Sequence, residues 1–226
     1  MESSPAVYAE PLPARLIRPK IKRAYHRTRL FNMLLHKTDA SAWWICGPAG
    51  SGKTTLVNTF LEYCGLPCIW YEMDESDSDI ASFFFYLGKA AECHISKDSP
   101  ELPLMTSEYF QGIPVFTRRF FELLCSMIDQ PCALVLDNYQ EIREETMLHE
   151  ILCNAISSGS SRLTIFVCSR QEPPAELIIP LSRCSLNVLG WNELKLEKEE
   201  AREIASLVTG KKFPGEALAH LHSLTD

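Results

Sequence analysis

Residues 42–56 read Ala-Trp-Trp-Ile-Cys-Gly-Pro-Ala-Gly-Ser-Gly-Lys-Thr-Thr-Leu. The apolar run at 42–46 predicts a buried strand, and residues 47–54 match the pattern G-x-x-x-x-G-K-[ST] in full. Apolar side chains then recur at helical spacing, at positions 56, 57, 60 and 61. Strand, glycine loop and helix therefore follow one another in the order that a phosphate-binding Walker A loop requires.

The residue types of this loop indicate how a nucleotide is held. Glycines let the backbone curl so that its N–H groups point inward, and the following helix adds the positive end of its dipole. Lys53 can reach the β- and γ-phosphates, and the hydroxyl of Thr54 can bind Mg²⁺. The predicted nucleotide-binding residues of the loop are Gly47, Pro48, Ala49, Gly50, Ser51, Gly52, Lys53, Thr54 and Thr55.

A second stretch supplies a carboxylate for the metal. Residues 132–138 read Cys-Ala-Leu-Val-Leu-Asp-Asn, and an unbroken apolar run is what a parallel strand buried on both faces needs. A carboxylate at the C-terminal end of such a strand lies where ligands bind in open α/β sheets. Asp137 is therefore predicted to contact Mg²⁺, directly or through its other ligands, as in a Walker B strand.

An arginine follows the next predicted strand, at 163–168, which ends in Ser169 and Arg170. Because this strand ends at the same sheet edge, Arg170 can approach the γ-phosphate. The alternative is that Arg170 is a solvated strand end.

Strands and helices alternate along the rest of the chain. Further strands are predicted at 67–71 and 185–189, and helices at 29–36, 80–91, 114–128, 144–156, 177–181, 197–208 and 216–221. The acidic residues 73–79 are predicted to form a solvated loop whose last residue, Asp79, caps the following helix. This alternation predicts an α/β P-loop NTPase fold, a three-layer sandwich whose parallel strands all end at one edge.

The chain is expected to have three parts. We place a flexible tail at 1–14, a P-loop nucleotide-binding domain at 15–190 and the start of a C-terminal helical module at 191–226. Residues 15–29 are rich in arginine and lysine. They form either a solvated strap or a strap over the base and ribose of the nucleotide, with an arginine near the phosphates.

Composition narrows the function classes. The net charge of −7 argues against direct DNA binding by the chain as a whole. The polar, proline-bearing N-terminus does not resemble a signal peptide, and no apolar run reaches the roughly 18 residues of a membrane span. The nine cysteines are scattered, and several lie in apolar runs, as buried free thiols do in a reducing compartment. We therefore expect a cytoplasmic protein that does not contact a membrane.

Several stretches, in order, resemble the nucleotide-binding domain of the STAND ATPases, in particular the large ATP-binding LuxR-type regulators related to the maltose regulon activator. The resemblance covers about 16–226 and includes the Walker A and Walker B stretches already described. The other stretches that carry it are Arg27-Thr28-Arg29-Leu30, Trp70-Tyr71-Glu72-Met73-Asp74-Glu75-Ser76-Asp77, Phe83-Phe84-Phe85-Tyr86-Leu87, Ser169-Arg170-Gln171-Glu172-Pro173-Pro174, and Leu194 with Glu200-Ala201.

The resemblance implies site residues beyond the loop. It implies that Arg170 senses the γ-phosphate and that Arg27 and Arg29, in the R-x-R-L lead-in, belong to the nucleotide site. Asn138 stands where the family usually has a second acidic residue, the presumed base for the attacking water, which predicts slow turnover. The family continues with a winged helix, a sensor array of helical repeats and a helix-turn-helix. We therefore expect a piece of a longer protein whose sensor and DNA-binding domains are its partners.

The predicted function is an ATP- or ADP-binding switch domain of a signal-responsive LuxR-type transcription regulator, with Mg²⁺ as cofactor and slow or regulated hydrolysis. Its predicted catalytic residues are Lys53, Asp137, Asn138 and Arg170. A nucleotide-dependent homo-oligomer is considered as a further partner state. Two alternatives stay open: a conventional P-loop ATPase or kinase with a separate substrate, and a nucleotide-binding scaffold without hydrolysis.

Overall fold

The structure is a computed structural model that describes residues 11–36, 41–95, 99–109, 111–143, 146–158, 162–183 and 185–210. Most of the tail predicted at 1–14 and the helix predicted at 216–221 lie outside these residues. Across the described ranges, no helix combines the length and the apolar character needed to cross a bilayer.

The centre of the fold is a five-stranded parallel sheet in the order β2-β3-β4-β1-β5. Its strands are β1 (Ala42–Cys46), β2 (Cys68–Glu72), β3 (Cys132–Asp137), β4 (Leu163–Ser169) and β5 (Leu186–Leu189). All predicted strands are present, with ends shifted by a residue or two. Because the strands are parallel, their carboxyl ends lie along one edge, where the loops carrying the predicted site residues begin.

Helices connect the strands and cover both faces of the sheet. The α-helices are α1 (Thr28–His36), α2 (Lys53–Tyr63), α3 (Ile80–Ala91), α4 (Ile113–Met127), α5 (Leu148–Ser158), α6 (Ile178–Ser182), α7 (Trp191–Leu194) and α8 (Lys198–Thr209). Short 3₁₀ turns are η1 (Ala14–Leu16), η2 (Glu75–Ser78), η3 (Glu92–His94), η4 (Ser107–Tyr109), η5 (Tyr139–Glu141) and η6 (Ala175–Leu177). The helix predicted from 144 begins at Leu148 among the described residues.

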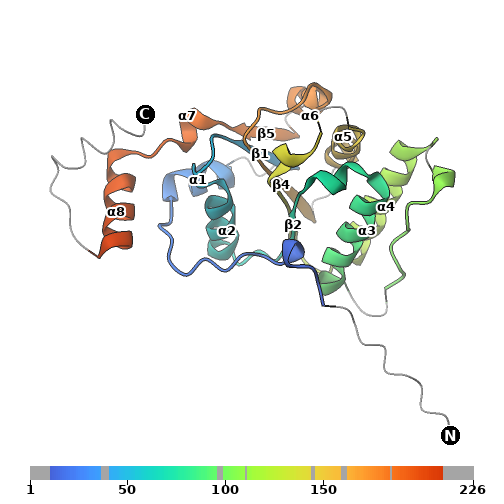
Figure 1. The fold of residues 1–226 in the computed structure, drawn as a ribbon, viewed down its shortest axis with the longest axis horizontal. Helices are drawn as coiled ribbons and strands as arrows, with labels where there is room; N and C mark the ends of the chain where they lie inside the picture. Colours follow the sequence, from blue (N-terminus) through green and yellow to red (C-terminus); the bar gives the residue numbers. More distant parts are fainter. Residues whose placement is uncertain are drawn as a thin grey trace, which may run out of the picture.

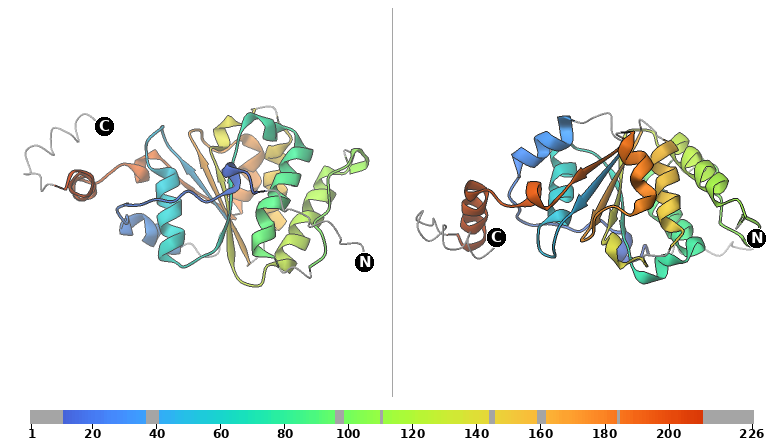
Figure 2. Two further views of the ribbon diagram at one scale, coloured as in Figure 1. Left: turned by 60° about the horizontal axis from the view of Figure 1, so that its bottom comes forward. Right: turned by 90° about the horizontal axis from the view of Figure 1, so that it is seen from above.

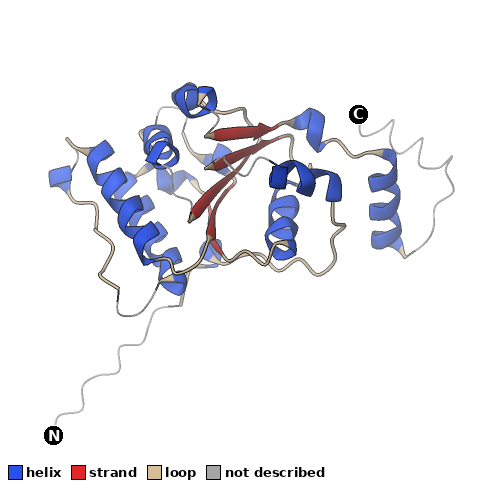
Figure 3. Cartoon of the chain, turned by 180° about the vertical axis from the view of Figure 1, so that it is seen from behind, coloured by secondary structure: helices blue, strands red, loops and turns tan. Residues whose placement is uncertain are grey.

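Alternating strand side chains divide the core into two clusters. Trp44, Tyr71 and Leu136 pack in one cluster with α3, α4 and α5, whereas Trp43, Trp70 and Val135 pack in the other with α1 and α2. Helices therefore lie on both sides of the sheet (Figure 1), and the view from behind shows the strands between them (Figure 3). The predicted three-layer α/β P-loop NTPase fold is confirmed.

Helix α8 lies outside the three layers, beyond α1 and α2 (Figure 2). A buried ion pair holds it there, because Arg27 Nη2 is 2.7 Å from Glu200 Oε2 and both side chains are under a tenth exposed. Burial acts to raise the pKa of Glu200, but hydrogen bonds from Arg27 and the Glu197 N–H and the charges of Arg27 and Arg29 outweigh it. The pKa of Glu200 therefore lies below its ordinary value. The pair joins the start of α1 to a helix late in the chain.

The acidic residues 73–79 differ from the solvated loop that the sequence predicts. Asp77 is fully buried, where its carboxylate lies 2.9 Å from Arg15 Nη1 and accepts a 2.6 Å hydrogen bond from the Tyr71 hydroxyl. The Asp74 N–H donates to the same carboxylate at 2.8 Å. The prediction of a solvated loop is wrong for Asp77, because its ion-pair partner lies 62 residues away in the chain. The helix cap at Asp79 is confirmed by a 3.0 Å bond from the Ser82 N–H.

We expect Asp77→Ala to lower the free energy of unfolding by about 3 kcal/mol, because the substitution removes one partner of a buried ion pair. Asp79→Ala, which removes only a helix cap, should cost about 1 kcal/mol. Urea denaturation of both variants measures the difference. Equal losses would contradict a buried role for Asp77.

Candidate functional site

The loop between β1 and α2 has a backbone that favours glycine at two positions, and a third glycine is closely packed. Gly50 and Gly52 have φ angles of 78° and 84°, in the left-handed region that side chains with a Cβ rarely adopt. Gly47 lies under α7, where an added Cβ would lie 3.0 Å from Leu194 Cδ1 and 3.5 Å from Trp191 Cε3. The loop 47–52 is therefore shaped both by its own turn and by packing against α7.

The N-terminus of α2 points into this loop. The first N–H groups of a helix have no acceptor within the helix, and α2 has no acidic residue in its first turn to occupy them. Gly52 caps the helix without a side-chain hydrogen bond. Loop and helix thus present backbone donors and the positive end of a helix dipole to an anion.

Lys53 lies over the loop. Its Nζ donates hydrogen bonds to the carbonyl oxygens of Gly47 and Pro48, at 2.7 and 2.9 Å, and to Ser51 Oγ at 3.4 Å. The pKa of Lys53 is lowered, first by burial and then by the positive charge of Arg170, although nearby acidic groups oppose the shift. An incoming phosphate would replace weak carbonyl partners with charged oxygens and so favour the ammonium form.

Thr54 and Asp137 meet although they are 83 residues apart in the chain. Thr54 Oγ1 donates to Asp137 Oδ1 at 3.0 Å, and the Asn138 N–H donates to the same oxygen at 3.1 Å. Adjacent oxygen ligands of an octahedral Mg²⁺, each about 2.1 Å from the ion, are about 3.0 Å apart. The hydroxyl and the carboxylate therefore fit a magnesium ion in both chemistry and spacing.

Asp137 is only 4% exposed. Burial raises the pKa of its carboxyl above the ordinary value, and the negative charge of Glu72 adds to this. The hydrogen bonds from Thr54 and Asn138 and the charge of Lys53 act in the opposite direction without cancelling it. A nearby cation would therefore relieve an unfavourable buried charge.

Asn138 links the ends of three strands. It has a φ of 58°, and its Nδ2 donates to Glu72 Oε1 at 3.1 Å, at the end of β2. Its Oδ1 accepts from Gln140 Nε2 at 3.3 Å, while Gln140 Oε1 accepts from the Arg170 N–H at 3.0 Å. Arg170, an exposed residue directly after β4, thus lies at the same edge as Lys53, where its charge affects the pKa of that lysine.

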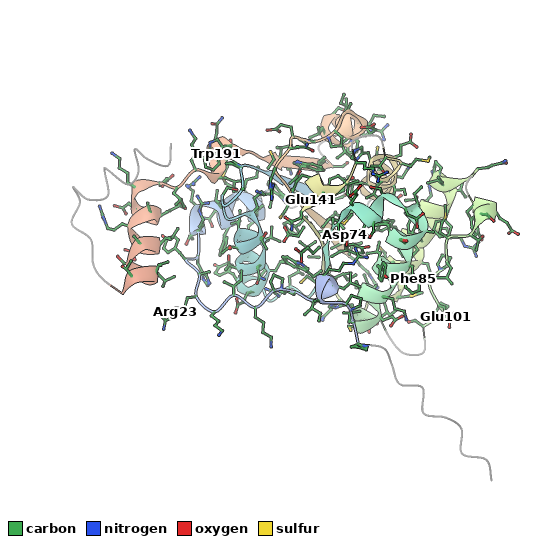
Figure 4. The ribbon with its side chains drawn as sticks, viewed as in Figure 1. Arg23, Asp74, Phe85, Glu101, Glu141 and Trp191 are labelled. Carbon is green, nitrogen blue, oxygen red and sulfur yellow. The ribbon has the colours of Figure 1, made fainter. Side chains whose placement is uncertain are left out.

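Sequence reasoning missed Glu72. The strand prediction ended at Tyr71, whereas β2 includes Glu72, which pairs in register with Asp137. Extending the strand by one residue would have placed this carboxylate at the ligand-binding edge. Two acidic residues of the loops that follow β2 and β3, Asp74 and Glu141, are labelled in Figure 4.

A cavity of about 540 Å³ adjoins the phosphate loop. Its walls come from the strap at 21–27, the loop, the first turns of α2, and the residues of α7 and α8. Figure 4 labels Arg23 on the strap and Trp191 at the start of α7, on two sides of this region. Ile204, Leu207 and Val208 of α8 give the cavity an apolar wall.

Arg27 and Arg29 have partners away from the phosphate loop. Arg27 Nη1 donates to the carbonyl oxygen of Leu194 at 2.9 Å, in addition to its pair with Glu200. Arg29 Nη2 donates to the carbonyl oxygens of Glu193 and Lys195, at 2.9 and 3.1 Å. The structure thus joins both guanidinium groups to 193–200, and their direct contact with a nucleotide stays a prediction.

The strap itself is held on α2. Arg18 Nη2 donates to the carbonyl oxygen of Asn58 at 2.7 Å, and Asn58 Nδ2 donates to the carbonyl oxygen of Pro19 at the same distance. Asn58 is a polar residue on a buried face of α2, only 3% exposed. The path of the strap along the cavity is therefore determined by specific bonds.

A comparison with curated proteins shows a similarity to a transcriptional regulator. The chain is 32% identical over 168 residues to the HTH-type transcriptional regulator MalT of Vibrio cholerae. The matched region covers 72% of this chain but only 18% of that protein, so the chain spans less than a fifth of its relative. No protein-family model matches the chain.

Solved structures show the same fold. Cdc6p from Pyrobaculum aerophilum has a TM-score of 0.51 at 16% identity and covers 89% of this chain and 51% of its own. A Walker-type ATPase of Pyrococcus abyssi has a TM-score of 0.54 at 14% identity, covering 92% of this chain and 66% of its own. The Aeropyrum pernix ORC1 protein, solved with DNA, has a TM-score of 0.51 at 14% identity, covering 94% and 57%. At these identities the likeness concerns the fold alone.

We expect Asp137→Asn to raise the melting temperature of the ligand-free chain at pH 7. The raised pKa of Asp137 means that the folded protein binds this proton more tightly than the unfolded chain, so ionisation counts against folding. Asparagine keeps an oxygen that accepts from Thr54 and Asn138, and a gain of about 3 °C would correspond to about 1 kcal/mol.

The gain should shrink as the pH falls and Asp137 itself becomes protonated. Thermal melts at neutral and acidic pH, with and without Mg²⁺, measure the gain in melting temperature and its decrease with falling pH. A variant that melts below the unmodified chain at pH 7 would contradict this electrostatic account.

Proposed function

We propose that this chain binds ATP or ADP with Mg²⁺ and acts as a nucleotide-gated switch domain of a transcription regulator. The observation that carries the proposal is the glycine loop opening onto an apolar-walled cavity of about 540 Å³. Ligand pockets have volumes of about 300–1,000 Å³ and combine apolar walls with a few polar groups. Phosphates on the loop N–H groups would place the nucleoside between the strap and α8.

Each predicted residue then has a distinct role. Lys53 would hold the phosphates, Thr54 and Asp137 would hold the metal, and Arg170 would contact the γ-phosphate. Mg²⁺ supplies positive charge that offsets the charge of the phosphate oxygens. Thr54 and Asp137 support this assignment because their oxygens already lie 3.0 Å apart.

The switch proposal rests on the cavity walls, which come from two different parts of the chain. The loop and α2 belong to the sandwich, whereas the opposite wall comes from α7 and α8, held by the ion pair between Arg27 and Glu200. A ligand biases a conformational equilibrium only through contacts that differ between the two states. A nucleotide in this cavity would contact both parts, so its binding can bias the position of α8.

The regulatory context is proposed from the likeness to the MalT transcriptional regulator. We assign the chain to the STAND-class ATPases and to the ATP-binding LuxR-type regulators. Inducer sensing and DNA recognition are proposed for parts of the full-length protein outside this chain, with a nucleotide-dependent homo-oligomer as the active form. The acidic net charge of −7 supports a nucleotide switch rather than a DNA-reading role for this chain.

The first test is Lys53→Ala. Loss of a charge-assisted contact to phosphate costs about 1.5–3 kcal/mol, which corresponds to a roughly 10- to 150-fold weaker affinity for MgATP. Isothermal titration calorimetry measures the change. The matched control is Lys89→Ala, which removes an exposed lysine of α3 that pairs with Glu92. This substitution should leave the affinity for MgATP unchanged. Equal affinities of Lys53→Ala and the unmodified chain for MgATP would contradict the Walker A assignment.

The second test separates ATP from ADP. If Arg170 contacts the γ-phosphate, Arg170→Ala should weaken ATP binding by about 10-fold, the equivalent of about 1.4 kcal/mol, and leave ADP binding nearly unchanged. Arg143→Ala, which removes an exposed arginine paired with Glu75, controls for the loss of a positive charge. An identical loss for both nucleotides would identify Arg170 as a structural residue.

A further inference from the structure

The carboxylate of Glu72, at the end of β2, lies beside the amide of Asn138, which follows the neighbouring strand β3. Asn138 follows the metal-binding Asp137, and an amide cannot take a proton from water at neutral pH. On the neighbouring strand, Glu72 pairs in register with Asp137, and its Oε1 accepts a 3.1 Å hydrogen bond from Asn138 Nδ2. The edge of the sheet therefore keeps a carboxylate beside the metal site, contributed by β2 instead of β3.

The other acidic residues of these loops already have partners. Asp74 lies 2.8 Å from Arg15 Nη1 and accepts hydrogen bonds from Ser76, and Glu75 lies 2.7 Å from Arg143 Nη2. Glu141 accepts from Gln140 Nε2 at 3.0 Å. Hydrogen bonds from Ser76 and the charge of Arg15 lower the pKa of Asp74, which makes it a poor proton acceptor, and Glu75 is held in its ion pair with Arg143.

Glu72 lacks the ion pair that Asp74 and Glu75 have, and its strand position pairs it with Asp137. Its side chain is exposed, and among the described residues no lysine or arginine pairs with it. The neutral amide of Asn138 holds Oε1, and Oε2 has no hydrogen-bond partner within the described ranges. Glu72 also acts electrostatically on Asp137, where its charge helps to raise the pKa of that carboxyl. An oriented carboxylate with one unbonded oxygen is what a general base needs.

Asn138 is itself held in place. Its left-handed backbone, with φ of 58°, directs the side chain, and its Oδ1 accepts from Gln140 Nε2. This bond fixes which end of the amide faces Glu72, because the Nδ2 group is the donor. Asn138 is thus a positioning residue for the carboxylate.

We propose that Glu72 is the general base for ATP hydrolysis in this chain, a role that rests on the nucleotide binding proposed above. Glu72 Oε2 takes a proton from a water molecule while the oxygen of that water forms a bond to the γ-phosphorus. The bond between the γ-phosphorus and the bridging oxygen breaks, and ADP leaves with the electron pair. Inorganic phosphate is the second product, and Glu72 returns its proton to phosphate or solvent.

The test is Glu72→Gln, a substitution that keeps an oxygen to accept from Asn138 but removes the base. Single-turnover hydrolysis with protein in excess over MgATP should slow by about 100-fold or more. Calorimetric affinity for MgATP should stay within about twofold, because the base acts on water and not on bound phosphate. The melting temperature should not fall, since the side chain is exposed and its negative charge is unfavourable beside the ionised Asp137.

Glu75→Gln is the matched control. It makes the same chemical change three residues away, at an exposed glutamate paired with Arg143, and should leave the single-turnover rate within about twofold. A second readout is the nucleotide that stays bound after incubation and rapid gel filtration. Glu72→Gln should elute with intact ATP, and the unmodified chain with ADP.

The outcomes separate this proposal from nucleotide binding itself. If the unmodified chain does not bind MgATP, the proposed function fails. If it binds MgATP but does not hydrolyse it, or if Glu72→Gln hydrolyses it at the unmodified rate, then Glu72 is not the base although binding stands.

Discussion

Parallel pairing of five buried strands is the constraint on which the rest of this structure depends. A sheet buried on both faces needs helices on both sides, and parallel strands need crossover connections that supply them. The same pairing brings every strand's carboxyl end to one edge. The phosphate loop after β1, Asp137 at the end of β3 and Arg170 after β4 are therefore neighbours because of the sheet topology.

The second organising interaction is the ion pair between Arg27 and Glu200, which holds α8 against the sandwich. Burying two charges is costly unless they are well paired and hydrogen-bonded, and here the Leu194 carbonyl and the Glu197 N–H supply further bonds. The pair lies behind the cavity that adjoins the phosphate loop. Removing either partner would leave the other charge buried without compensation, so this contact constrains where α8 lies.

The environment of each carboxylate near the sheet edge depends on the side chain it contacts, and not on its position in the sequence. Asp77, Asp74 and Glu75 are neutralised by arginines from distant segments, which leaves the acidic stretch 73–79 largely structural. Asp137 is buried beside a hydroxyl, an arrangement that favours a metal ion. Glu72 keeps its carboxylate next to an amide. The carboxylates of Glu72, Asp77 and Asp137 therefore have three different environments, because each faces a different neighbour.

The sequence by itself determined the fold class, the strands and the phosphate loop, because periodicity and the glycine pattern act over a few residues. It also placed Lys53, Thr54, Asp137 and Arg170 at one edge, since the parallel arrangement follows from alternating strands and helices. The burial of Asp77, the partners of Arg27 and Arg29, and the contact between Glu72 and Asn138 were decided only by the tertiary structure. Each depends on a contact between segments far apart in the chain, up to 173 residues for Arg27 and Glu200, and no local pattern encodes such a partner.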